Sequence, residues 1–143
     1  MIDVSRIDIY DFIANKLKAI TKNVYSMGVP TENTQSDIEN GFLVIKVGDL
    51  NDDSEFECEA KVWARCYVSA YVPKKAKRGT LDKALYKSYE DAINALVQSE
   101  QSNVGDGFYI LSKNILSMDD EETTSKGNQF YVFIKSFIVA KDN

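Results

Sequence analysis

The sequence predicts an α+β fold in which an antiparallel or mixed sheet of four to five strands carries two helices on one face. Two observations predict it: apolar and polar residues alternate over 56–72, as in a half-buried strand, and two other segments carry apolar residues at helical spacing. The order of helix, two or three strands, helix and two strands lacks β-α-β alternation, which favours antiparallel pairing. The 143 residues are expected to form a single domain, 1–143, with a core that needs no metal or disulfide.

The first helix is expected over residues 5–22. Ser5 is suited to cap it, and Asp8 completes a short capping box. The apolar side chains that recur on one face are Tyr10, Ile13, Ala14, Leu17 and Ile20. A short strand over 24–29 and a polar loop over 31–40 are expected to follow, and a loop of that length is typical of functional or mobile segments.

A strand over 41–50 is expected to pair with the long strand over 56–72 in an antiparallel hairpin, because the residues between them are rich in turn formers. The even-numbered residues of the long strand are all apolar and predict one wall of the core. We expect this strand to bend, bulge or project from the domain, because a usual strand has about five or six residues. Pro73 and the residues after it are expected to end the strand.

The second helix is predicted over residues 81–98, with Thr80 as its cap. Its predicted apolar side consists of Leu81, Ala84, Leu85, Tyr89, Ala92, Ala95 and Leu96. Two strands, over 108–118 and 129–140, are expected to close the sheet and to be joined by an acidic hairpin loop at 119–128.

Composition argues against several classes of protein. The net charge of −5 is opposite to the basic excess of duplex-binding proteins, so we expect no sequence-specific nucleic acid as a partner. No segment approaches the ~20 apolar residues of a membrane span, and the N-terminus lacks the pattern of a leader, so we expect no membrane partner and a cytoplasmic location. Cys58 and Cys66 share one strand face about 26 Å apart, too far for a disulfide, and are expected to be buried thiols.

The sequence offers no catalytic constellation. It contains no histidine, which excludes a histidine-assisted nucleophile and removes the commonest metal ligand. The alternating acids at 49–55 resemble the start of a calcium loop but lack its glycine and closing glutamate. The acidic cluster at 119–122 and the basic run at 74–78 are better explained as solvated loops than as a divalent-ion site or a phosphate site. We therefore expect no catalytic, cofactor-binding or metal-binding residues and no enzyme.

The odd-numbered side of the long strand carries Trp63, Arg65, Tyr67 and Tyr71. These residue types are enriched at protein interfaces. Either this side binds a partner, or the chain's own loops or a helix cover it. Because both helices are needed on the apolar side, we favour a contact surface formed by these four residues.

Several features in order along the chain carry a family resemblance. They are the N-terminal helix, the turn Met27-Gly28-Val29-Pro30, the strand over 42–47 with its long hairpin partner, a central helix carrying residues 91–96, and two closing strands. Across nearly the whole chain this order resembles that of the tail-terminator and tail-completion (neck) proteins of tailed bacteriophages.

The resemblance implies a structural virion protein, assembled in the host cytoplasm, whose partners are itself, the tail-tube protein and the head connector. Such subunits form a ring, commonly a hexamer, that stops polymerisation of the tail tube. A monomeric protein-binding module, an inhibitor or adaptor that uses the same aromatic side of the long strand, is the alternative.

Overall fold

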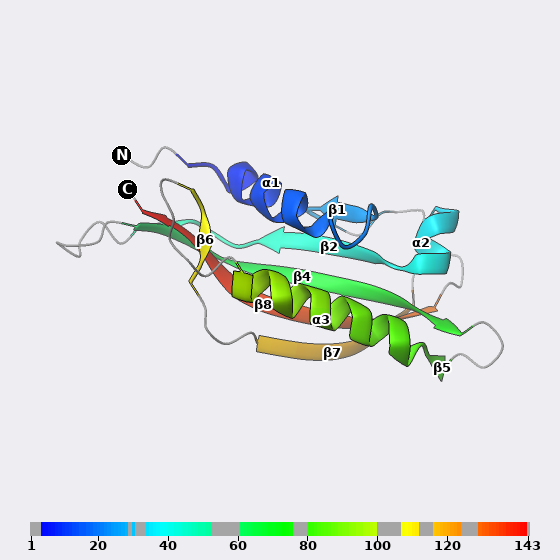
Figure 1. Ribbon diagram of the computed structural model, residues 1–143. Helices are drawn as coiled ribbons and strands as arrows, with labels where there is room; N and C mark the ends of the chain where they lie inside the picture. Colours follow the sequence, from blue (N-terminus) through cyan, green and yellow to red (C-terminus); the bar gives the residue numbers. More distant parts are fainter. Residues whose placement is uncertain are drawn as a thin grey trace.

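The computed structural model of the chain describes residues 4–28, 30, 34–52, 61–75, 80–99, 107–111, 116–123 and 129–142. Its elements in order are α1 (Arg6–Leu17), β1 (Val24–Ser26), α2 (Gln35–Asn40), β2 (Phe42–Val47), β3 (Asn51–Asp52), β4 (Lys61–Lys75), β5 (Thr80–Leu81), α3 (Lys83–Ser99), β6 (Tyr109–Ile110), β7 (Leu116–Thr123) and β8 (Gln129–Asp142). The fold is α+β, with three helices in the described part of the chain (Figure 1).

The strands form one sheet whose central order is β1-β2-β4-β8-β6, five strands wide. The short strands β3 and β5 also pair with β4, and β7 pairs with β8. β1 runs parallel to β2, whereas the other described pairs are antiparallel, so the sheet is mixed. The predicted width of four to five strands is confirmed.

β4 and β8 form the long axis of the sheet. They pair without a bulge from Lys61 opposite Asp142 to Pro73 opposite Phe130, and Figure 1 shows them side by side along the whole sheet. β4 continues past Pro73 to Lys75, contrary to the prediction. Because pairing with β2 has already ended at Tyr71, the missing N–H of the proline breaks no bond to that strand. The predicted start of the strand, residues 56–60, lies outside the described residues.

One face of the sheet, called the helix face here, is covered by both α1 and α3, as predicted (Figure 1). The buried side chains that meet there include Val62, Ala64, Cys66, Val68, Ala70 and Val72 of β4, Ile9, Tyr10, Ile13 and Leu17 of α1, and Tyr89, Ile93 and Val97 of α3. The predicted apolar side of α3 is confirmed at Leu85, Tyr89 and Leu96, which pack in the core. Ala84 and Ala95 are exposed instead, and the prediction left out Ile93 and Val97, which are buried. Ile93 and Val97 bury more apolar area than alanines, so they determine which side of the helix faces the sheet.

α1 begins at the predicted cap and is tied to the end of β2. The Ser5 side chain accepts the capping bond of a capping box. The helix ends at Leu17 rather than near residue 22, because i→i+3 hydrogen bonds tighten the following turn. At the end of β2, Val47 N–H donates to Tyr10 Oη at 3.0 Å and the Arg6 guanidinium donates to the Val47 carbonyl oxygen. The last backbone groups of β2 are thus bonded by side chains from the helix that covers it.

The polar segment predicted as a loop contains α2. Thr34 and Asp37 form its capping box, with Thr34 Oγ1 accepting the Asp37 N–H at 3.1 Å and the Asp37 carboxylate accepting the Thr34 N–H at 3.0 Å. The Tyr25 hydroxyl of β1 donates to the same buried carboxylate at 2.8 Å. Gly41 ends the helix with a φ of 81°, and a Cβ at this position would lie 2.4 Å from the Tyr71 carbonyl oxygen. α2 is therefore anchored at one end of the sheet (Figure 1).

Two further boundaries differ from the prediction. The strand expected over 108–118 is described as β6 and β7, and residues 112–115 between them lie outside the described residues. β7 continues through residues 119–123, which were predicted as loop, because its backbone pairs with β8 as far as Gln129. At the start of α3 the cap is Asp82, whose Oδ1 accepts the Leu85 N–H at 3.2 Å, whereas Thr80 belongs to β5.

Candidate contact surface

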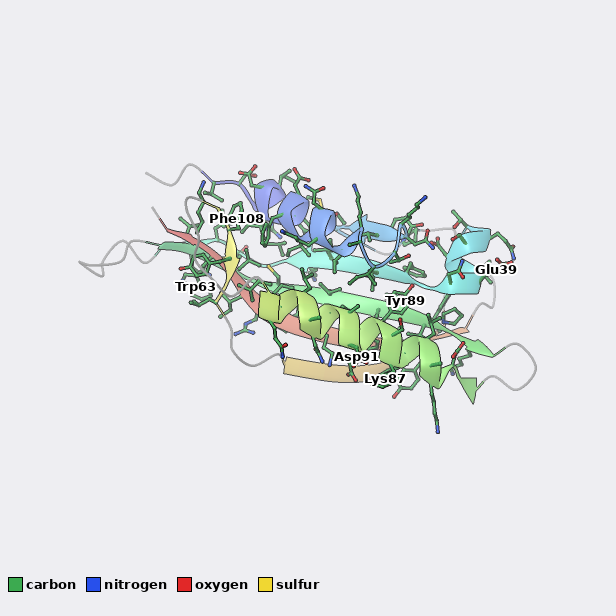
Figure 2. The ribbon with its side chains drawn as sticks, viewed as in Figure 1. Glu39, Trp63, Lys87, Tyr89, Asp91 and Phe108 are labelled. Carbon is green, nitrogen blue, oxygen red and sulfur yellow. The ribbon has the colours of Figure 1, made fainter. Side chains whose placement is uncertain are left out.

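The face of the sheet opposite α1 and α3, called the outer face, carries the predicted contact residues. Alternation along β4 places Trp63, Arg65, Tyr67 and Tyr71 on it. The first three are partly exposed, whereas Tyr71 is only 9% exposed. Figure 2 shows Trp63 near β6, at the opposite end of the sheet from Glu39 of α2. The outer face therefore has two halves with different properties.

The half nearer α2 is covered by its own aromatic side chains. The Tyr71 ring stacks on Phe42 with centroids 4.5 Å apart and an interplanar angle of 8°, and Phe130 contacts Phe42 edge-on at 5.3 Å. Val44 and Val132 complete the buried cluster, whose members all come from strands. Tyr71 is thus part of a second small core on the outer face. Because it is buried there, it is not included in the contact surface proposed below.

The other half carries a group of side chains that we call the basic aromatic patch, formed by Lys46, Trp63, Arg65, Tyr67 and Ile138. Lys46 of β2 lies directly opposite Tyr67, and Ile138 of β8 lies directly opposite Arg65, so these residues share one face. Lys46 is exposed and the other four are partly exposed. Sequence reasoning missed Lys46 and Ile138. Alternation in the sequence places Lys46 on the same side of its strand as Phe42. That this side is the one that carries Tyr67 becomes clear only from the register of β2 with β4.

The electrostatics of the patch are opposite in sign to those of the chain. The Arg65 guanidinium donates to Ser136 Oγ at 3.1 Å, which holds its charge against the sheet. Lys46 supplies a second cation, so the five residues of the patch carry two positive charges and no negative one. The whole chain carries a net charge of −5. The patch is therefore a local positive area on an acidic protein.

The described residues show no sign of nucleophilic or metal chemistry. Cys66 is fully buried on the helix face, and burial raises the pKa of its thiol to about 12, so it stays protonated and unreactive at neutral pH. Within the part of the chain that the structure describes, no cluster of three or more metal-ligating side chains occurs. The buried ammonium of Lys135 is paired with the Glu90 carboxylate of α3 at 2.8 Å. This lysine is accounted for by packing and pairing.

Some sequence predictions fall outside the described residues. These are Cys58, the part of the calcium-like segment after Asp52, and the end of the basic run, residues 76–78. Of the acids predicted to lie in the last hairpin loop, those at 119–122 belong to β7. The described helices include none long and apolar enough to span a membrane.

Comparison with known proteins adds no relative to this picture. No protein-family model matches the chain, and a search of curated proteins gives no match. The functional argument therefore rests on the fold and on the outer face of the sheet.

Proposed function

We propose that the chain is a structural virion protein of a tailed phage or prophage, of the tail-terminator or tail-completion (neck) class. In this proposal it assembles as a ring that caps the tail tube and joins it to the head connector. The observation that carries it is the basic aromatic patch, which lies on the sheet face opposite α1 and α3 and combines partly exposed Trp63, Tyr67 and Arg65. Tryptophan, tyrosine and arginine are the residues that dominate binding energy at protein contacts.

The distribution of the apolar side chains supports a contact role for this face. α1 and α3 both cover the helix face, and the aromatic cluster around Phe42 makes the outer face rigid next to the patch. A rigid sheet surface loses little conformational entropy when it binds, which favours repeated assembly of identical subunits. The order of the elements, which resembles that of the phage family, supports the ring and the location in the virion.

The proposal is tested by the mass of the purified protein in solution, measured by light scattering over a range of concentrations, and by electron microscopy of the same samples. We expect a ring-sized oligomer for the wild type, and for a Lys87→Ala control, because Lys87 is exposed on α3 away from the outer face (Figure 2). Trp63→Ala and Tyr67→Ala should lower the mass while the circular dichroism spectrum stays that of a folded protein.

Two results would count against the proposal. A wild-type protein that remains monomeric, both alone and when mixed with tail-tube protein, excludes a ring-forming role. A stable 1:1 complex with a nonviral partner that is lost in Tyr67→Ala favours the monomeric binding module instead.

A further inference from the structure

An exposed leucine extends the basic aromatic patch across the sheet. The Leu111 N–H donates to the Ile138 carbonyl oxygen at 2.8 Å, so the pairing of β6 with β8 continues for one residue past Ile110. Ile110 is buried on the helix face, and alternation therefore places Leu111 on the outer face beside Ile138. Leu111 is an exposed apolar side chain, at 42%. The extended surface thus has a cationic side on β2 and β4 and an apolar side on β8 and β6.

The cations and the apolar side chains of this surface are close neighbours. Arg65 lies directly opposite Ile138, and directly opposite residues have Cβ atoms about 5 Å apart. Lys46 lies opposite Tyr67, two residues along β4 from Arg65, so the two cations are diagonal neighbours with a spacing of about 7–8 Å. A surface that complements this one carries an exposed apolar side chain with a carboxylate beside it and a second carboxylate one neighbour further on.

The start of α1 carries this combination. Ile7 is 46% exposed, and Asp8 and Asp11 are exposed on the outward side of the helix. Residues three or four apart on a helix have Cβ atoms about 5–6 Å apart, so Asp11 is a neighbour of both Ile7 and Asp8. The Asp8 carboxylate accepts the Ser5 N–H at 2.8 Å, which fixes it at the helix start. Arg6 donates to a carbonyl oxygen of β2, so its charge is held at the sheet.

Most other carboxylates with described side chains are engaged within the chain. Asp37 is buried, and Asp82 caps α3. Glu90 and Asp91 are paired with lysines. The start of α1 therefore offers two neighbouring exposed carboxylates together with an exposed apolar side chain, as the patch requires.

We infer that the basic aromatic patch of one copy, extended by Leu111, binds the start of α1 of a second copy. The spacing places Asp11 against Arg65 and Asp8 toward Lys46. Ile7 then packs on the apolar side of the patch. This inference rests on the proposed ring function and specifies its interface. The patch and α1 lie on opposite faces of the sheet, so one copy offers both surfaces at once (Figure 1). Head-to-tail contacts of this kind close into rings when the rotation between neighbours allows it.

Charge reversal on each surface tests the inference, with association measured as the mass from light scattering over a concentration series. Arg65→Glu and Asp11→Lys should each associate at least about 10-fold more weakly than the wild type, because like charges then meet at every contact. The double variant Asp11→Lys/Arg65→Glu exchanges the two charges and should recover the wild-type association. Leu111→Ser should also weaken association, because it removes apolar area from the contact. The controls Lys87→Glu and Glu39→Lys make the same changes in net charge at exposed residues outside both surfaces and should associate like the wild type.

The outcomes separate this inference from the proposed function. An oligomer that Asp11→Lys or Leu111→Ser leaves unchanged overturns the contact with α1 while a ring function stands. A double variant that stays dissociated, although circular dichroism shows that it is folded, does the same. A monomeric wild type overturns both. If Arg65→Glu fails to fold, Lys46→Glu takes its place, since Lys46 is exposed. It must then weaken association and recover it when combined with Asp11→Lys, or the inference is wrong.

Discussion

Replacing each of two tyrosines on the same face of β4 with alanine should affect different properties: Tyr71→Ala should lower stability, and Tyr67→Ala should weaken association. Tyr71→Ala removes a ring that is 9% exposed and stacked 4.5 Å from Phe42, so it should cost stability. Loss of a buried aromatic side chain costs about 3–5 kcal/mol. At about 4 °C per kcal/mol for a chain of this size, the unfolding midpoint should fall by roughly 10–20 °C. Tyr67→Ala removes a partly exposed ring of the patch and should cost about 1 kcal/mol or less.

The assay is thermal unfolding followed by circular dichroism, paired with light scattering. Because assembly raises the unfolding temperature by mass action, the midpoints are compared at a concentration at which the wild type is dissociated. At higher concentration Tyr67→Ala should remain smaller than the wild type in mass. The reasoning is refuted if Tyr71→Ala unfolds within about 3 °C of the wild type, or if Tyr67→Ala loses as much stability as Tyr71→Ala.

Three further predictions concern the framework behind the patch. Gly41→Ala should lower the free energy of unfolding by roughly 2–5 kcal/mol, because its φ is 81° and the new Cβ would lie 2.4 Å from a carbonyl oxygen of β4, whereas Gly28→Ala, with nothing within 4 Å, should be nearly neutral in the same denaturant titration. Burial raises the pKa of Cys66 from 9.0 for the free thiol to about 12, so the contribution of the protonated thiol to the free energy of unfolding is fully present below pH 9.0 and is lost as the pH rises toward 12. Cys66→Ala should therefore reduce the fall in the free energy of unfolding between pH 9 and 12. An unchanged slope would contradict the assignment. Glu90→Gln should cost roughly 1–3 kcal/mol, because it removes the carboxylate that pairs with the buried Lys135 ammonium, yet it should cost almost nothing in a Lys135→Met background. Equal costs in both backgrounds would show that the ion pair is not the cause.

Much of the fold was predictable because periodicity reports burial. The even-numbered residues of β4 from Val62 to Val72 are all buried, and the Ser5 capping box forms as its spacing indicates. α2 was missed because its six residues carry no apolar stripe. The available signal was the pair Thr34 and Asp37, which has capping-box spacing with aspartate in place of the usual glutamate.

The strand β7 was only partly predicted because its sequence opposes its structure. Residues 119–122 are acidic and have low strand propensity, yet they continue the ladder opposite residues 130–133 of β8. Tertiary pairing overrides local preference at such positions. The parallel pairing of β1 with β2 could not be predicted from the sequence either. Three residues are too few to show a periodic pattern, and their register with β2 depends on the rest of the fold.

The sequence predicted which residues of the candidate site share one face of β4, but not which of them are exposed. Alternation places Trp63, Arg65, Tyr67 and Tyr71 together, and the structure confirms that shared face. Alternation in the sequence does not reveal that Phe42 lies opposite Tyr71 and helps to bury it, because neighbours across strands depend on register. For the same reason sequence reasoning did not connect Lys46 with the patch.

The most direct test of the contact surface uses the fluorescence of Trp63, the single tryptophan of the chain. Its quenching by acrylamide is measured over a concentration series alongside the mass from light scattering. If the basic aromatic patch is the contact surface, quenching should decrease in step with the increase in mass, because assembly removes the indole from solvent. An oligomer that forms while Trp63 remains as easily quenched as in the monomer would contradict the assignment.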